Sequence, residues 1–139
     1  MNDDIYYMKE AIKEAKKAYK KNEIPVGVII VEDNKIISRG HNLRDSSNIV
    51  TKHAEIIAIE KANRKLNNWR LVNCTLYSTL EPCNMCREVI KESKINKVIY
   101  GANNSNICRS NYDQINSHNL IKECEELIKN KFIEIRNNN

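Results

Sequence analysis

The sequence has no apolar run long enough to cross a membrane, and its first residues lack the positive charge of a signal peptide. A membrane-spanning helix needs about 20 consecutive apolar residues, and residues 1–4 include two aspartates where a signal peptide carries basic residues. We therefore expect a cytoplasmic protein without a membrane partner. Aromatic residues make up only 6% of the chain, and Trp69 and Tyr112 are too few to predict a stacking platform for single strands.

A disulfide framework is not indicated either, because the number of cysteines is odd. Two of the five form a Cys-x-x-Cys pair, Cys83 and Cys86. In a reducing compartment this pattern favours a metal site or a redox pair over disulfides. The other three are isolated in the sequence, and we expect them to be small core or surface thiols. They are Cys74, Cys108 and Cys124.

The composition is that of one globular domain over residues 1–139, with no internal repeat. Apolar residues make up 41% and charged residues 29% of the chain, which is enough for a core without disulfides. The net charge is +5, and the positive excess lies in segments 52–70 and 87–109, which each have five basic and two acidic residues. This suits a polyanionic partner, although mixed surface charges commonly serve only solvation.

Alternation of helical and strand patterns along the chain predicts an α/β fold. Apolar residues at helical spacing, and a proline suited to the first position of a helix, predict helices over 8–19, 53–66, 82–93 and 120–132. Short apolar or alternating runs predict strands over 26–31, 35–40, 74–79 and 98–102, with a further edge strand near 112–115. The first two strands form an antiparallel hairpin, residues 43–52 form a loop, and a right-handed crossover makes the last two long strands parallel. The expected architecture is a three-layer α/β/α sandwich with a mixed central sheet.

Two short stretches combine to predict a catalytic metal site. Residues 53–55 read His-Ala-Glu, and residues 82–86 read Pro-Cys-Asn-Met-Cys. Alone, the first suggests an acidic helix start, and the second suggests a structural zinc half-site or a redox pair. Together, His53, Cys83 and Cys86 supply three ligands and leave a fourth position open, as catalytic zinc sites do. If both helices begin at the same sheet edge, the three side chains converge there.

Glu55 is the expected general acid–base beside this metal. Zinc with an open position lowers the pKa of bound water from ~15.7 to about 7. A carboxylate two residues from the imidazole can move the released proton to a ring nitrogen and then to a departing amine. Hydrolytic removal of an exocyclic amine from an aromatic base needs this sequence of proton transfers.

The sequence resembles the TadA-type tRNA adenosine deaminases of the zinc-dependent cytidine/deoxycytidylate deaminase superfamily over nearly its whole length. The matching stretches are EIPVG (23–27), GHN (40–42), HAEI (53–56), TLYSTLEPCNMC (75–86), VIYGA (98–102) and ECEEL (123–127). The resemblance implies a cytidine-deaminase-like fold, one Zn²⁺ per subunit on His53, Cys83 and Cys86, and Glu55 as the proton shuttle. It further implies a substrate-binding set of Asn42, Ala54, Pro82 and Asn104, with the backbone at Cys83 also facing the reacting centre.

The same resemblance implies a homodimer that converts adenosine to inosine at the wobble position of a tRNA anticodon loop. The chain departs from the family in segment 103–108, which replaces an acidic residue and a Lys-Thr-Gly loop with an Asn-rich, shorter stretch. Its last helix has Phe132 as the only aromatic residue. Because relatives grip RNA there, other substrates stay open: another single-stranded nucleic acid such as DNA, or a free base or nucleoside such as cytosine or guanine. Stretch 40–44 is also similar to fungal-type cytosine deaminases. A non-catalytic partner subunit is the remaining alternative, against which the intact Glu55 argues.

Overall fold

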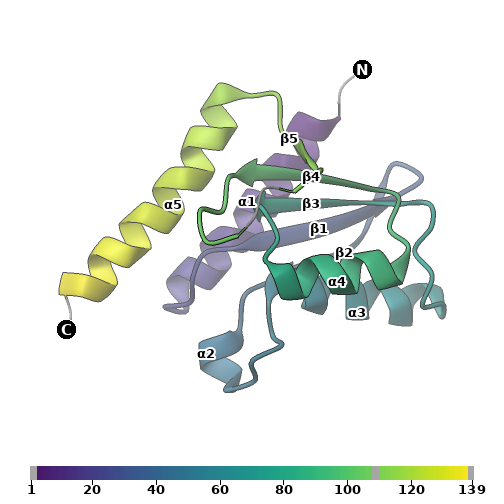
Figure 1. The fold of residues 1–139 in the computed structure, drawn as a ribbon, viewed down its shortest axis with the longest axis horizontal. Coiled ribbons are helices and arrows are strands. Elements are labelled where there is room, and N and C mark those ends of the chain that lie inside the picture. The colour runs from purple at the N-terminus through teal and green to yellow at the C-terminus, as the bar shows by residue number, and fades with distance from the viewer. Residues whose placement is uncertain (1–2, 108–109, 138–139) are drawn as a thin grey trace.

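The computed structural model describes residues 3–107 and 110–137. Cys108, predicted to be an isolated thiol, lies outside the described residues. In chain order the elements are α1 (Asp4–Lys20), β1 (Gly27–Glu32), β2 (Lys35–His41), α2 (Arg44–Ser47), α3 (Ala54–Leu66), β3 (Cys74–Leu80), α4 (Asn84–Ser93), β4 (Lys97–Ala102), β5 (Asp113–Gln114) and α5 (His118–Asn137) (Figure 1). None of the helices in the described part of the chain is both long and apolar enough to span a membrane.

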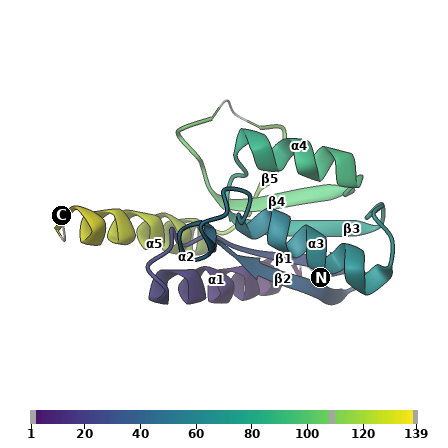
Figure 2. The same cartoon turned by 90° about the horizontal axis from the view of Figure 1, so that it is seen from below.

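The five strands form one mixed sheet in the order β2-β1-β3-β4-β5. Strand β1 pairs antiparallel with both β2 and β3, whereas β4 runs parallel to β3 and β5 runs parallel to β4. Helices α1 and α5 cover one face of the sheet, and α3 and α4 cover the other (Figure 1, Figure 2). The predicted three-layer α/β/α sandwich is therefore confirmed, as are the hairpin, the parallel crossover and the short edge strand.

Strand β1 supplies both halves of the core. Ile29 and Val31 belong to the apolar cluster shared with α1 and α5, whereas Val28 and Ile30 belong to the cluster shared with α3 and α4. Successive side chains of a strand point to opposite faces, so a strand covered on both sides must be apolar throughout. The continuous apolar run in the sequence is explained by this position.

Helices α3 and α4 begin one and two residues later than predicted. His53 is the N-cap of α3 and Cys83 is the N-cap of α4, whereas the sequence pattern predicted starts at His53 and Pro82. Both N-cap residues have extended backbones, with ψ values of 152° and 172°, and neither side chain makes a capping hydrogen bond. The imidazole and the thiol therefore project from the helix ends toward each other instead of back onto their own helices.

The predicted loop over 43–52 contains a one-turn helix, α2, and this part of the prediction is wrong. None of the α2 residues is buried, so the sequence offers no apolar face that would signal a helix. The backbone N–H groups of Asp45 and Ser46 instead donate to the carboxylate of Glu23, which lies ahead of β1. Asn48 ends the turn in a left-handed conformation, with φ of 57°.

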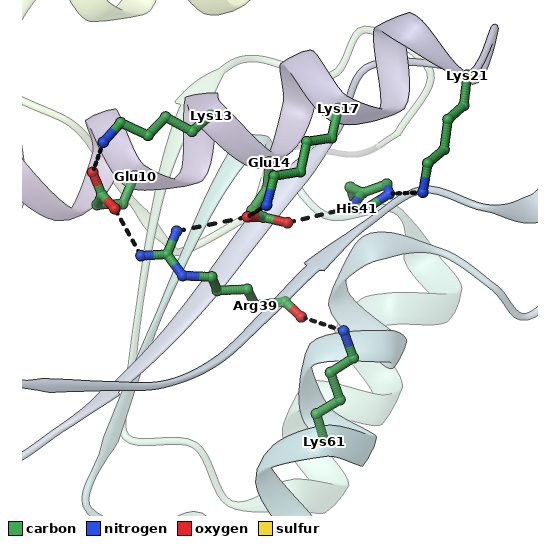
Figure 3. Close-up of polar contacts among 8 residues, drawn as sticks. All are labelled: Glu10, Lys13, Glu14, Lys17, Lys21, Arg39, His41 and Lys61. Carbon is green, nitrogen blue, oxygen red and sulfur yellow. Dashed lines mark hydrogen bonds and ion pairs between the residues drawn. The ribbon is translucent and has the colours of Figure 1, made fainter.

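A polar cluster around the buried Glu10 and Glu14 ties edge strand β2 to helix α1 (Figure 3). Arg39 lies 2.7 Å from a carboxylate oxygen of Glu10 and 3.6 Å from one of Glu14. The Nδ1 atom of His41 lies 3.2 Å from Glu14, and Lys61 of α3 donates to the backbone carbonyl of Arg39. The end of β2, from which the chain continues to Asn42, is thus held by helices of both layers.

Candidate active site

Helices α3 and α4 start at the same edge of the sheet and bring three candidate metal ligands together. The Nδ1 atom of His53 lies 3.7 Å from the Sγ atom of Cys83 and 3.6 Å from that of Cys86. All three ligand atoms lie within 4.8 Å of one another. Nitrogen and sulfur ligands about 2.1 and 2.3 Å from a tetrahedral zinc are about 3.6 Å apart. The two nitrogen–sulfur distances therefore match those expected around a bound zinc.

The two thiols differ in their readiness to ionise. Hydrogen bonds from Cys86 and from His53 lower the pKa of Cys83 to about 3. The pKa of Cys86 is raised, because its thiol donates to Cys83 and is buried. The hydrogen bond between His53 and Cys83 raises the pKa of His53. The cluster thus concentrates negative charge on sulfur at a helix N-terminus, which favours a thiolate ligand over a neutral thiol.

Glu55 lies beside this cluster but is not one of the converging ligands. Its side chain is buried in the first turn of α3, with only 4% of the residue exposed. Burial raises the pKa of Glu55 to about 7. A carboxylate with this pKa can both accept and release a proton near neutral pH, as general acid–base catalysis requires.

A cavity of about 740 Å³ opens onto His53, Cys83 and Glu55, whereas Cys86 is buried behind its wall. Ala54, predicted to face the substrate, lines it, and so do Asn42 and Asn104. Pro82 is buried and is not among the residues that line the cavity. Its contact with a substrate stays a prediction. The site thus combines a metal cluster, an acid–base group and room for an organic substrate.

The two asparagines on the cavity wall already have partners in the protein. Asn42 donates to the carbonyl of Ile24 and accepts from the backbone N–H of Arg44. Asn104 donates to the carbonyl of Glu81 and accepts from the backbone N–H of Asn106. Each amide therefore holds its own loop in place, and the predicted contacts with a substrate base and ribose stay predictions.

The sequence pointed to the last helix only through the resemblance and did not identify which of its residues line the cavity, and it did not reveal the carboxylates at the rim. Helix α5 contributes a wall with Glu125, Ile128, Lys129 and Phe132. The buried carboxylates of Glu23 and Glu81 accept hydrogen bonds from the chain segments at the rim. The sequence signals for these carboxylates are that each glutamate precedes a proline at a strand end, in Glu-Ile-Pro and Glu-Pro, and that both lie in stretches that match the family.

Residues 1–102 match the sequence profile of the cytidine and deoxycytidylate deaminase zinc-binding region. The chain belongs to the cytidine and deoxycytidylate deaminase family. The family profile and the short distances between the ligand atoms of His53, Cys83 and Cys86 confirm the expected zinc cofactor.

Individual relatives in the deaminase family agree with the resemblance seen in the sequence. A tRNA-specific adenosine deaminase of Streptococcus pyogenes serotype M18 is 50% identical over 104 residues, which are 75% of this chain and 65% of that protein. The alignment therefore spans slightly less than two thirds of that relative's length. The resemblance to TadA-type tRNA adenosine deaminases is confirmed.

Two solved structures share the cytidine-deaminase-like fold. One comes from studies of A-to-I editing by tRNA:A34 deaminases at the wobble position of transfer RNA. It superposes with a TM-score of 0.80 at 32% identity, over 88% of this chain and 99% of that one. The other is a guanine deaminase from Bacillus subtilis, with a TM-score of 0.71 at 35% identity, over 81% of this chain and 72% of that one. The fold prediction is therefore confirmed.

Proposed function

We propose that this protein is a zinc-dependent hydrolytic deaminase that converts adenosine to inosine at the wobble position of a tRNA. The observation that carries the proposal is the position of Glu55, which is buried and lines the same cavity as His53 and Cys83 of the metal cluster. A structural zinc site needs no acid–base group, and a redox pair leaves the converging His53 unexplained, whereas hydrolytic deamination needs both a metal and a proton carrier beside it. The similarity to tRNA-specific adenosine deaminases supports the choice of substrate.

The chain's own residues account for the proton movements of this reaction. His53, Cys83 and Cys86 would hold the zinc, which when bound supplies a Lewis acid that activates the attacking water. Glu55 accepts the proton that the water loses and delivers it to the ring nitrogen beside the reacting carbon. It then moves the proton of the newly added hydroxyl to the exocyclic amine, so that the C–N bond breaks, ammonia leaves and the carbonyl of inosine forms. The helix N-termini at the site favour the developing negative charge.

The RNA part of the proposal rests on charge and on the family. The segments 52–70 and 87–109 each carry a net charge of +3, from five basic and two acidic residues. The first segment contains α3, and the second begins within α4, one residue after Cys86, so both adjoin the metal site. Phosphate contacts by lysine and arginine supply most of the affinity for nucleic acids. We further propose a homodimer with one zinc per subunit, working in the cytoplasm, as the resemblance implies.

The test is deamination of an anticodon stem-loop that carries a wobble adenosine. We expect inosine from the wild-type protein and none above background from Glu55→Ala, while a stem-loop with a wobble guanosine gives no product in either case. An absence of inosine with fully zinc-loaded wild-type protein would contradict the proposal. A protein that retains zinc and deaminates no amine substrate would instead be the non-catalytic partner subunit.

Deamination of a free base is a second candidate, favoured by the similarity to a guanine deaminase of Bacillus subtilis. The cavity of about 740 Å³ exceeds the size of one purine, and Asn-rich segment 103–106 forms part of its wall. Ammonia release from guanine, cytosine, adenine and their nucleosides separates the two candidates. Release from a free base that outpaces inosine formation in the stem-loop would favour this second function.

A further inference from the structure

Two buried glutamates hold two segments at the rim of the cavity by the same kind of contact. Glu23 is 1% exposed and accepts hydrogen bonds from the backbone N–H groups of Asp45 and Ser46 and from the Ser46 hydroxyl. Glu81 is 2% exposed and accepts from the backbone N–H groups of Asn104 and Ser110 and from the Ser110 hydroxyl. Each carboxylate thus gathers two backbone donors and one serine.

Neither carboxylate takes part in an ion pair within residues 3–107 and 110–137. A buried carboxylate without such a partner depends on its hydrogen-bond donors, and losing one leaves a charged oxygen unsatisfied. The two rim segments are mostly exposed and contribute little apolar burial of their own. Hydrogen bonds to the two carboxylates, together with those of the Asn42 and Asn104 side chains, therefore keep these segments in place, and apolar packing contributes little.

The two anchors lie at the edge of the sheet where the metal ligands converge. Glu23 precedes β1 and Glu81 follows β3, and these strands are antiparallel neighbours, so both residues lie at the same edge. The segment held by Glu23 contributes Arg44 to the cavity lining, and the segment held by Glu81 contributes residues 103–107. The metal cluster is formed separately, by the N-caps and first turn of α3 and α4.

We propose that Glu23 and Glu81 are positioning residues for substrate selection, each of which fixes one wall of the cavity through its buried hydrogen bonds. The statement about substrate rests on the proposed function, whereas the statement about the walls does not. Because the anchored segments surround the cavity without supplying the metal ligands or Glu55, loosening them weakens substrate binding and leaves the chemical step intact.

The test compares Glu23→Gln and Glu81→Gln by hydrogen exchange of the zinc-loaded protein. Glutamine keeps the size of the side chain but places an NH₂ group, a donor, opposite donors. We expect Glu81→Gln to speed exchange at the amides of Asn104 and Ser110 at least tenfold and to leave those of Asp45 and Ser46 unchanged. Glu23→Gln should give the reverse pattern, so each variant serves as the control for the other.

The kinetic arm uses the anticodon stem-loop. Each glutamine variant should raise KM about tenfold, with kcat within twofold and the zinc content unchanged. Ser110→Ala should repeat part of the Glu81→Gln effect, Ser110→Thr should restore wild-type values, and the double variant Glu81→Gln, Ser110→Ala should be no worse than Glu81→Gln. Asn111→Ala is the matched control, since this neighbouring side chain is exposed and makes no hydrogen bond in the described part of the chain.

Unchanged exchange at Asn104 and Ser110 in Glu81→Gln would overturn the proposal, and so would a fall in kcat at constant KM. If Glu81→Gln does not fold, Ser110→Ala and Ser46→Ala carry the same comparison, because each removes only one donor. If the wild-type protein does not deaminate the stem-loop, the proposed function fails, whereas the exchange measurement still decides whether each carboxylate holds its wall.

Discussion

Replacing Gly40 with alanine should disturb the metal site through helix α3. A Cβ atom at Gly40 would lie 2.6 Å from the carbonyl oxygen of Ala54 and 2.9 Å from the backbone nitrogen of Ala58. Ordinary van der Waals contact begins at 3.4 Å, so the first turn of α3 must move by about 0.8 Å (3.4 − 2.6). His53 immediately precedes that turn, and zinc ligand distances hold only within about 0.2 Å. The shift therefore moves the His53 imidazole away from the position in which it and Cys83 can bind the same zinc.

The expected loss of stability follows from the same contact. Overpacking of this kind costs about 1–3 kcal/mol. The unfolding entropy of a 139-residue chain, at ~2.1 cal/mol/K per residue, is about 0.29 kcal/mol/K. The melting temperature of Gly40→Ala should therefore fall by about 3–10 °C. Gly27→Ala is the matched control, because its Cβ would lie 2.1 Å from the carbonyl oxygen of Ala11 in α1, in the other layer.

The assay measures the melting temperature of the metal-free proteins and their zinc affinity in competition with a chelator. We expect both alanine variants to lose stability, and only Gly40→Ala to bind zinc at least about tenfold more weakly, since 1.4 kcal/mol corresponds to tenfold. Equal zinc affinities for Gly40→Ala and Gly27→Ala would refute the reasoning, because α3 would then have absorbed the contact without moving its N-cap. An unchanged melting temperature for Gly40→Ala would refute the overpacking itself.

Three further predictions concern the acid–base group, the metal and acid stability. Glu55→Gln should retain zinc but form inosine about 10²- to 10⁴-fold more slowly, whereas Cys83→Ala should lose both zinc and activity. Zinc analysis and single-turnover rates measure the two effects. A zinc-free Glu55→Gln protein would contradict the assignment of Glu55 as a proton carrier that is not a ligand. When free zinc is present at 100 times its Kd, removing it should lower the free energy of unfolding by about 2.7 kcal/mol, which corresponds to about 9 °C in melting temperature by the entropy above. An unchanged melting temperature in calorimetry would argue against the zinc site. Hydrogen bonds from Lys13 and from Arg39 lower the pKa of Glu10 below its usual 4.5, so its contribution to stability is present above that value and is lost as pH falls through the folded pKa. The free energy of unfolding, measured with urea between pH 6 and 3, should therefore fall less steeply with decreasing pH for Glu10→Gln than for the wild type. Identical slopes would contradict this prediction.

The motifs of the site could be found without the structure because their spacing is local. His53 and Glu55 are two residues apart, and Cys83 and Cys86 are three apart, so each pair is placed by one helix start. The helices themselves were predictable from apolar spacing. What the pattern missed is the cap position of His53 and Cys83, because proline and the apolar run mark the beginning of a helix only to within one or two residues.

The rims of the cavity were not predictable in the same way. Helix α2 has no apolar face and is held by Glu23, 22 residues before Asp45. Asn104 and Ser110 are held by Glu81, 23 and 29 residues earlier. Such contacts join a single carboxylate to backbone amides that any residue possesses, so the identity of the residues at 45 or 104 carries almost no signal of them.

The sequence by itself determined the chemistry of this protein, since three soft ligands and a carboxylate at helix starts admit few uses. Only the tertiary structure decided which surroundings the substrate meets. Antiparallel pairing of β1 with β3 places Glu23 and Glu81 at one edge of the sheet, and α5 closes a wall with residues that are distant in the chain. The physical reason is the separation along the sequence of the residues involved. Each group of ligands is placed within one helical turn, whereas the shape of the cavity depends on contacts between elements that are far apart in the chain.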